Sequence, residues 1–527
     1  MAMHSYVGKD LTGRDFSEKN LNGYDFSNAI LIGAKFRKAT LENTNFTGAK
    51  LHNADFLGAN LADAKLTDAD LSGANLENAN FKNAILRRTN LTQAILVNTK
   101  FRGAILEHAI LEDTDLRQAI FNGASLHYVN LSGSDFSEMD MSGVSFLNAI
   151  LINAKFIKAK LQITDFSGAN LQHADFSDGN LFGAKFIGAD LTEANFLNAH
   201  LESTVFRDGT LNQAILVNAK LKAAILENAT LIKANLTNAI LTGGFLDEVN
   251  LSGANLSGAD FSHAKMEHAD LRNAILDQAN FSHANLQRAN FQGFNLIQNV
   301  KFENTNLKSA TFWGETLENV NFQSAILDNA DLQQVKLTNV RFRLTKLRGA
   351  NLRNSDLSEI YFRRADLTNA DLTHSNLEAA NLSKTNLTQA NFQNAKLAGA
   401  NLEGANLRAA KLEGADLQGV NLQKANLTVT VLKNVNLTGA DLRKANLQAA
   451  QLLQANLFGV QLDGASLQLT NVQSANLEGA NLYGTDLSHI KNLTLTQLQS
   501  ARCWECAKYD SKWFDVLFVE SKVADVQ

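Results

Sequence analysis

The sequence contains no proline and only two cysteines among its 527 residues. Proline lacks a backbone N–H, so its absence is expected of a chain that depends on an unbroken backbone hydrogen-bond ladder. Two cysteines exclude a disulfide framework. No apolar run approaches the length of a membrane span, and the opening segment MAMHSYVGKD has no basic region followed by an apolar one. We therefore expect a cytoplasmic protein that has no membrane partner.

The net charge is also small. The chain carries 48 lysine and arginine residues against 53 aspartate and glutamate residues, which gives a formal net charge of −5. A nucleic-acid binder or a strongly acidic mimic would carry a larger imbalance. The composition therefore argues against a nucleic-acid partner.

In place of these features, the sequence has a large apolar residue at every fifth position, which we call the centre of a repeat. The centres run in steps of five from Leu11 to Leu296 and from Phe302 to Leu487. The position two residues before each centre, which we call the slot, usually holds alanine, and the residue between them is mostly asparagine or aspartate. Small, polar, large is the inward–outward–inward alternation of a short strand, and the next two residues must turn a corner. A strand that turns every five residues with one side inward winds into a coil around its large side chains.

Phenylalanine centres indicate how many repeats make one coil. They recur every 20 residues in several parts of the chain, as in Phe302, Phe322, Phe342 and Phe362. A recurrence of 20 residues means four repeats per coil, with like rings stacked on one face. The predicted fold class is therefore an all-β solenoid with a square cross-section.

The blocks ANLEG and ANLRA follow the pattern A-(N/D)-L-x-x, which resembles the pentapeptide-repeat family. The resemblance covers residues 11–487. It implies a right-handed quadrilateral β-helix, here of about 24 coils of four pentapeptides, and at about 4.8 Å per coil a rod on the order of 115 Å long. It also implies a non-enzymatic scaffold for protein interactions. The alternative is a DNA mimic that acts on a topoisomerase such as gyrase, although the family members that work in this way are acidic and much shorter.

The beginning of the chain departs from the repeat. Residues 1–10 precede the first centre as a lead-in, and the first slots hold Lys9, Arg14 and Lys19. A charged side chain at such a position cannot point into the axis. We therefore expect these long side chains to cover the open end of the first coil.

Within the predicted β-helix at 11–487, one interval between neighbouring centres is one residue longer than the others. Six residues in place of five separate Leu296 from Phe302, and Glu315 occupies a nearby slot. We predict one bulged residue within 297–301, with Phe281 and Phe302 still stacked on one face. The bulge is either a local kink or a landmark for a partner.

Residues 488–527 leave the pentapeptide pattern. Thr494 followed by Gln497 has the spacing of a capping box, which predicts the start of a short helix. We expect this helix and an aromatic cluster to cover the strand edges of the last coil, the cluster being Trp504, Tyr509, Trp513 and Phe514. The expected assembly is a monomer or an end-to-end dimer.

Candidate chemistry is sparse. Cys503 and Cys506 form a lone C-x-x-C, which suits redox chemistry, metal binding or packing within the terminal segment. The neighbouring sequence offers neither the context of a redox motif nor two further metal ligands, so packing is favoured. The sequence has no nucleophile elbow, P-loop or dinucleotide-binding fingerprint, and a filled coil has no cleft. We expect no catalytic residue, no cofactor and no metal.

One stretch has a strong charge imbalance. Between Leu332 and Arg364 the only acidic residues are Asp356 and Glu359, whereas the basic residues are Lys336, Arg341, Arg343, Lys346, Arg348, Arg353, Arg363 and Arg364. Arginine forks suit carboxylates and phosphates. Five of these arginines form a candidate interaction surface for an unidentified acidic protein partner. We call this surface the basic patch, and its residues are Arg341, Arg343, Arg348, Arg363 and Arg364. A solvated ridge without a partner is the alternative.

Overall fold

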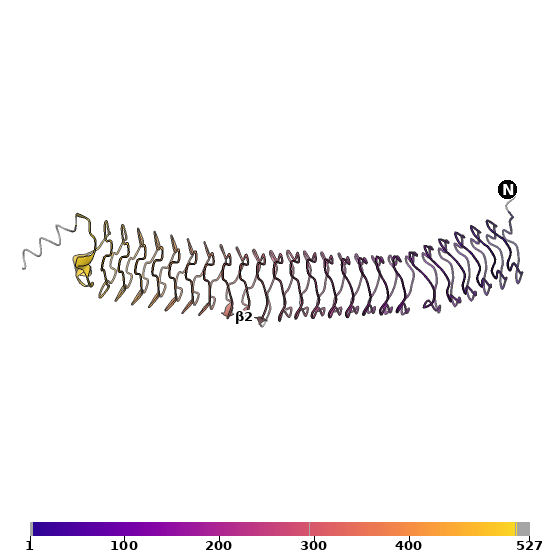
Figure 1. The fold of residues 1–527 in the computed structure, drawn as a ribbon, viewed down its shortest axis with the longest axis horizontal. Helices are drawn as coiled ribbons and strands as arrows, with labels where there is room; N and C mark the ends of the chain where they lie inside the picture. Colours follow the sequence, from indigo (N-terminus) through magenta and orange to yellow (C-terminus); the bar gives the residue numbers. More distant parts are fainter. Residues whose placement is uncertain (1–3, 295, 512, 514–527) are drawn as a thin grey trace, which may run out of the picture. The chain divides into compact units, whose positions relative to one another are not determined.

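The structure is a computed structural model that describes residues 4–294, 296–511 and 513. The chain divides into two compact units, Met1–Lys265 and Met266–Gln527. Within each unit, short rungs of backbone stack in parallel, and bridged residues are one coil apart, as in Asp25 with Asn45 and Asn401 with Asn421 (Figure 1). One turn of the solenoid therefore contains four pentapeptides, which confirms the prediction from the phenylalanine spacing.

Each repeat joins the next coil through backbone hydrogen bonds and closes its own corner with another. The repeat centred on Leu402 is representative, with N–H to C=O distances of 2.7 Å from Leu402 to Asn421, 2.8 Å from Gly404 to Gln423, 2.8 Å from Asn401 to Ala380, and 3.0 Å from Ala405 back to Leu402. The second residue after each centre has a positive φ, for example 64° at Gly404 and 56° at Asn394. Glycine and asparagine tolerate this conformation best, which explains their frequency there.

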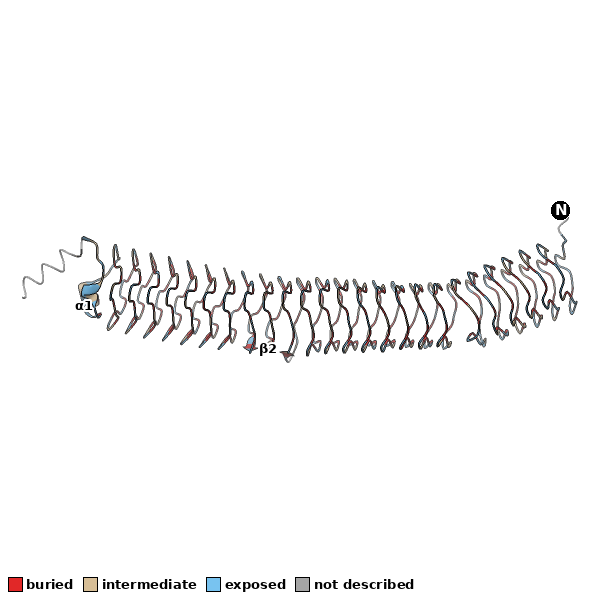
Figure 2. Cartoon of the chain, viewed as in Figure 1, coloured by how far each residue is buried: buried red, intermediate tan, exposed pale blue. Residues whose placement is uncertain are grey.

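The interior of each unit is filled by the centres and slots. Phe302, Phe322 and Phe342 are fully buried and stack in register, with ring centroids 5.1 Å and 5.2 Å apart. Alanine in the slots is buried beside them, and buried positions recur along every coil (Figure 2). Each buried centre contributes roughly 1.5–3 kcal/mol, so the stacked core stabilises the ladder.

The asparagine or aspartate before each centre also has a structural role. The side-chain oxygen of Asn401 accepts the backbone N–H of Glu403 at 3.0 Å, which fixes the start of the corner. The side-chain N–H of Asn421 then donates to the same oxygen at 3.2 Å. A column of asparagines therefore repeats the backbone ladder on the outside of the coil.

The first coil is closed by aromatic and cationic side chains. The ladder already begins at Ser5, which is bridged to Asp25. The guanidinium of Arg14 lies 5.5 Å from the ring centre of Tyr6 and 5.2 Å from that of Phe16. The prediction that long side chains cover this end agrees with these contacts.

The ladder of the first unit is interrupted on three faces. Ser125 and Ser145 are bridged, but among the described residues no bridge joins Ile110 to Asn130, Asp115 to Asp135 or Ile120 to Asp140. Asp115 and Asp135 would be neighbours of like charge, and Met139 fills a slot that usually holds alanine. Both features disfavour close stacking of these coils. The repeat pattern did not predict this interruption.

The one-residue slip lies before Ile297, so its prediction within 297–301 was wrong. Ile297 is fully buried as the centre, whereas Leu296 is 39% exposed. Asn290 pairs with Thr311 across the extra residue, but Ile297 already pairs with Leu317 at the normal interval. The extra residue therefore falls within 292–296. The periodicity did not distinguish Leu296 from Ile297, because both are large and apolar.

The rings of Phe281 and Phe302 remain stacked across the slip. Their centroids are 5.4 Å apart and their planes differ by 11°. The predicted preservation of coil order is confirmed.

Glu315 holds the slip in place. Its side chain fills a slot and is only 3% exposed. One carboxylate oxygen accepts the backbone N–H of Gly293 at 2.7 Å, and the other accepts that of Phe294 at 3.0 Å. Burial raises the pKa of Glu315, and these two hydrogen bonds only partly oppose that shift. The carboxylate therefore accepts hydrogen bonds from two backbone N–H groups in the segment that contains the inserted residue.

Three coils after the slip contain short extended strands. They are β1 (Ile297–Gln298), β2 (Thr316–Glu318) and β3 (Lys336–Thr338), which form one parallel sheet in the order β1-β2-β3 (Figure 1). Ile297 pairs with Leu317, and Leu317 pairs with Leu337. Each strand leads into a corner, at Asn299, Asn319 or Asn339, that is a bend in place of the usual hydrogen-bonded turn.

After the last repeat come the helix α1 (Leu495–Gln499) and a 3-10 turn at Trp504–Cys506. The hydroxyl of Thr494 accepts the N–H of Gln497 at 3.2 Å, and the Gln497 side chain accepts the N–H of Thr494 at 2.9 Å. The predicted capping box is confirmed. The Gln497 amide also donates to the carbonyl of Ala475 at 2.7 Å, which places the helix against the last coils.

The terminal cysteines differ from their expected role. Cys503 and Cys506 are free and exposed, so packing of the thiols within this segment was wrong. The rings of Tyr509 and Trp513 lie 6.4 Å apart. Phe514, the last member of the expected aromatic cluster, lies outside the described residues.

Deleting single residues tests where the slip lies. Removing Leu296 leaves five residues for the step from Phe291 to Ile297, so the coil should keep its circular dichroism spectrum and its cooperative melting. Removing Gln298 leaves four residues for the step from Ile297 to Phe302, and a centre pulled out of the core should cost about 2–5 kcal/mol. Equal damage from both deletions would contradict the assignment.

Replacing Glu315 by glutamine tests the buried carboxylate. Glutamine, like the protonated carboxyl group, is neutral and has one acceptor oxygen, so parent and variant should have similar free energies of unfolding at low pH. Because burial raises the pKa of Glu315, its contribution to stability is greatest below the ordinary pKa of 4.5 and is lost as the pH rises through the raised value. Denaturant titrations should therefore show the parent losing stability relative to the variant as the pH rises toward neutral. Glu318→Gln on β2 is the control, and a pH-independent difference at Glu315 would refute this role.

Candidate functional site

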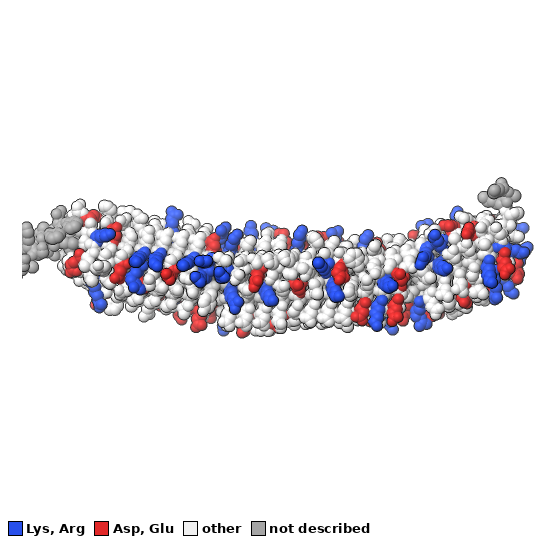
Figure 3. Space-filling model, viewed as in Figure 1, with Lys and Arg blue, Asp and Glu red and all other residues white. Residues whose placement is uncertain are grey.

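Four arginines of the basic patch lie on one face of two neighbouring coils. Arg341 and Arg343 flank the centre Phe342, and Arg363 and Arg364 follow the centre Phe362 one coil later. The two phenylalanine rings stack at 4.9 Å, which fixes the coils in register beneath the arginines. All four side chains are exposed. Figure 3 shows lysine and arginine side chains gathered over this part of the second unit.

Arg348, the fifth residue of the basic patch, is engaged elsewhere. It follows the centre Leu347, one repeat after Phe342. Its Nε donates to a carboxylate oxygen of Asp366 at 2.7 Å. Burial alone would raise the pKa of Asp366, but hydrogen bonds from Thr368 and Arg348 hold the pKa below its usual value. Arg353 similarly lies 3.6 Å from a carboxylate oxygen of Asp371. These two arginines are neutralised within the fold.

The other four arginines are not neutralised. No aspartate or glutamate in the described ranges 4–294, 296–511 and 513 lies within ion-pairing distance of Arg341, Arg343, Arg363 or Arg364. Like charges on adjacent rungs repel one another modestly. The stability of the fold therefore gives no reason for this cluster.

Beside these arginines, the corner of the coil is open. In an ordinary corner the slot N–H donates to the carbonyl of the preceding centre, as from Ala325 to Phe322 at 2.9 Å. At Val300, Val320 and Val340 this N–H has no acceptor among the described residues. The corner residues Asn299, Asn319 and Asn339, which follow β1, β2 and β3, form a bend in place of a hydrogen-bonded turn.

The cause is the residue in the slot. Val300, Val320, Val340 and Ile360 occupy the same slot in four successive coils, so their branched side chains stack on one another. An isolated valine in this slot is compatible with a closed corner, because the N–H of Val420 donates at 3.2 Å. At Ile360 the corresponding distance is 3.4 Å, which is intermediate. Consecutive branched residues therefore push the corner outward.

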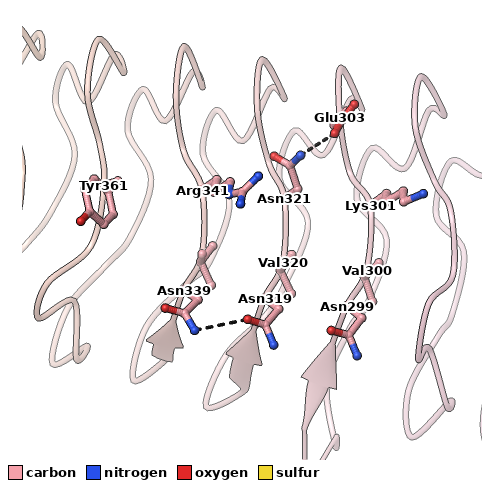
Figure 4. Close-up of a pocket in the computed structure, with 11 residues that line it drawn as sticks. Asn299, Val300, Lys301, Glu303, Asn319, Val320, Asn321, Asn339, Arg341 and Tyr361 are labelled. Atoms are coloured by element: carbon pink, nitrogen blue, oxygen red, sulfur yellow. Dashed lines mark hydrogen bonds between the residues drawn. The ribbon is translucent and has the colours of Figure 1, made fainter.

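The open corner creates a hollow of about 700 Å³ on the surface of the second unit. Figure 4 shows the corner asparagines in a row and, on the next face, the side chains of Lys301, Asn321, Arg341 and Tyr361 on successive coils. Asn339 donates to the side-chain oxygen of Asn319 at 3.3 Å. The hollow is lined by Asn299, Val300, Lys301, Glu303, Asn319, Val320, Asn321, Asn339, Val340, Arg341 and Tyr361.

Both cations of the hollow are available, whereas its carboxylate is engaged. Asn321 donates a side-chain hydrogen bond to Glu303 (Figure 4). Neither Lys301 nor Arg341 forms an ion pair with any residue in the described part of the chain. The side chain of Tyr361 is 63% exposed at the end of the row. The hollow is therefore rich in hydrogen-bond donors.

The charge pattern of the sequence predicts the arginine cluster but not the hollow beside it. The signal was present, because Val300, Val320, Val340 and Ile360 replace small residues at intervals of one coil. Reading the slot column as well as the centre column would have identified it. Lys301 lies outside the charge-imbalanced stretch 332–364, so that stretch gives no sign of it.

Other surface features give weaker evidence for a binding site. A second hollow of about 550 Å³ lies at the interrupted ladder of the first unit and is lined in part by Glu112, Asp113 and Asp115. Asp115 is already paired with Arg117 at 2.8 Å. Within the described residues, no group of three histidine, cysteine or carboxylate side chains is placed to hold a metal ion. The same part of the chain contains no helix of the length and apolar character needed to cross a bilayer.

The chain is similar to several known structures. A pentapeptide repeat protein from the cyanobacterium Nostoc sp. PCC 7120, HetL, described as involved in heterocyst differentiation regulation, is 30% identical over 45% of this chain and 88% of its own, with a TM-score of 0.18. A pentapeptide repeat protein from the cyanobacterium Cyanothece 51142, Rfr23, is 35% identical over 19% of this chain and 63% of its own, with a TM-score of 0.16. The plasmid-mediated fluoroquinolone resistance protein QnrB1 is 20% identical over 43% of this chain and 96% of its own, with a TM-score of 0.21.

No curated protein matches the chain. The family model for pentapeptide repeats matches most of it, in overlapping segments that cover residues 10–293, 301–339, 345–383, 385–448 and 455–491. The first gap in this match contains Ile297, the centre that follows the slip. The matched segments, the five-residue period and the coil of four repeats agree, and the chain belongs to the pentapeptide-repeat family.

Proposed function

We propose that this protein is a non-enzymatic scaffold that binds a protein partner through its basic patch. The observation that carries the proposal is the set of four exposed arginines, Arg341, Arg343, Arg363 and Arg364, that lack acidic partners among the described residues. They cluster in a chain whose net charge is −5. A local excess of one charge that the fold does not neutralise is typical of a surface for a partner of opposite charge.

A scaffold also suits the architecture. We take the solenoid to be the right-handed quadrilateral β-helix of the family, with about 24 coils and α1 as part of a terminal cap. Its interior is filled by side chains such as Phe322 and Leu402, so the recognition chemistry must lie on the faces. Flat, regularly spaced faces suit the binding of extended protein surfaces.

Arginine is a suitable residue for such a surface. Its planar guanidinium binds carboxylates through two parallel hydrogen bonds and stacks on aromatic rings. Arginine and tyrosine are also enriched among the residues that dominate binding energy at interfaces, and the exposed Tyr361 lies beside Arg341 on the adjacent rung. A DNA mimic is less well supported, because a basic cluster would repel a surface that binds DNA.

Neutralising the four free arginines tests this function. In the variant Arg341→Gln, Arg343→Gln, Arg363→Gln and Arg364→Gln, the melting temperature should be unchanged or slightly raised, because like charges are removed. Partners recovered from lysate by affinity capture should be lost or reduced, and parent binding should fall as salt is added.

The matched control replaces by glutamine four cationic side chains outside the basic patch that are paired with acids in the second unit, namely Arg272, Arg353, Lys433 and Arg443. It changes the net charge by the same amount and should retain the partners. If the first variant captures every partner as well as the parent does, the basic patch is only a solvated ridge.

A further inference from the structure

The hollow beside the basic patch is bordered by a regular row of backbone donors, on residues that are themselves only 1% exposed. Val300, Val320 and Val340 line it, and their N–H groups have no acceptor in the described part of the chain. They lie one coil apart, so the donors repeat at about 4.8 Å. An N–H without a protein partner needs water or a ligand, and a ligand with several acceptors replaces several waters at once.

Two cations border the same row. Lys301 and Arg341 occupy equivalent positions two coils apart, so their backbones are separated by about 10 Å. In an extended peptide, side chains on one side repeat at about 7 Å, and the long side chains of lysine and arginine accommodate the difference. Two carboxylates at alternate positions of an extended segment can therefore reach both cations.

The distribution of charge favours a peptide over a nucleic acid. Glu303 lines the hollow between the Lys301 and Asn321 rungs, and Glu318 lies in β2 just before the corner. A continuous phosphate backbone would face both carboxylates, whereas a peptide can place uncharged residues opposite them. Tyr361 is the one aromatic residue among those that line the hollow, and successive bases would need several such rings for stacking.

We infer that the hollow binds an extended acidic segment of a protein partner, with carboxylates at alternate residues. The side-chain carboxylates contact Lys301 and Arg341, and peptide carbonyls or carboxylates accept from the N–H groups of Val300, Val320 and Val340. The exposed Tyr361 packs against the end of the segment. This inference rests on the proposed scaffold function and names the chemistry of the partner at this site.

The direct test measures the binding of fluorescently labelled peptides to the full chain by fluorescence anisotropy. The probe is a peptide of about eight residues that alternates glutamate and serine, long enough to span the hollow at about 3.3 Å per residue. A peptide that alternates glutamine and serine and an oligothymidylate of similar length are the comparison probes. The glutamate peptide should bind more tightly than both, and its affinity should fall with salt.

Variants of the hollow separate it from the general charge of the chain. In the triple variant Val300→Ala, Val320→Ala and Val340→Ala the corners should close as at Ala325, and binding should weaken at least about tenfold because the N–H row is consumed. The control Val420→Ala with Val460→Ala acts on the same slot where the corners are already closed, and it should bind as the parent does. Lys301→Gln with Arg341→Gln changes exposed side chains only and should also weaken binding about tenfold.

Three results would overturn the inference. They are no binding of the glutamate peptide to the parent, full binding by the triple valine variant, and an oligothymidylate that binds as tightly as the peptide. If the peptide fails while captured partners still depend on the four arginines, the scaffold function stands and only this assignment of the hollow falls. If captured partners do not depend on the arginines, the basic patch itself is refuted.

Discussion

The parallel backbone ladder, repeated at intervals of one coil, is the constraint on which the rest of the structure depends. Most corners between its rungs close through a hydrogen bond from the slot N–H to the carbonyl of the preceding centre, which a small slot residue permits. Alanine makes this bond at 2.9 Å in Ala325, and an isolated valine still makes it at 3.2 Å in Val420. The absence of proline follows from the same constraint, because most backbone N–H groups donate to the ladder or to a corner.

The informative parts of the molecule are those where a slot does not hold a small residue. Glu315 turns a slot into a receptor for two backbone N–H groups and so accommodates one inserted residue. The stacked valines at 300, 320 and 340 leave their own N–H groups unpaired and create a hollow. Lys301 and Arg341 line that hollow, and the other free arginines lie on the coils that contribute Arg341 and Tyr361. A change of residue inside the coil therefore determines where the surface of the coil is hollowed.

The sequence predicted the regular parts of the fold because their physics is local. The five-residue period, the coil of four repeats and the capping box at Thr494 and Gln497 follow from short-range patterns. It misplaced the slip, because Leu296 and Ile297 are equally apolar and only the register between coils distinguishes them. It also grouped Arg348 with the free arginines, since the ion pair with Asp366 depends on contacts with the next coil. The open corner was not foreseen, because it arises from a column of slot residues and from no single repeat.

The column of branched slot residues at Val300, Val320 and Val340 keeps its own corners from closing. Amide hydrogen exchange measured residue by residue tests this claim most directly, because it reports whether each slot N–H is hydrogen-bonded. The amides of Val300, Val320 and Val340 should exchange at least about a hundredfold faster than those of Ala325, Ala350 and Val420, which are bonded in closed corners. Equal protection of all six amides would contradict the claim.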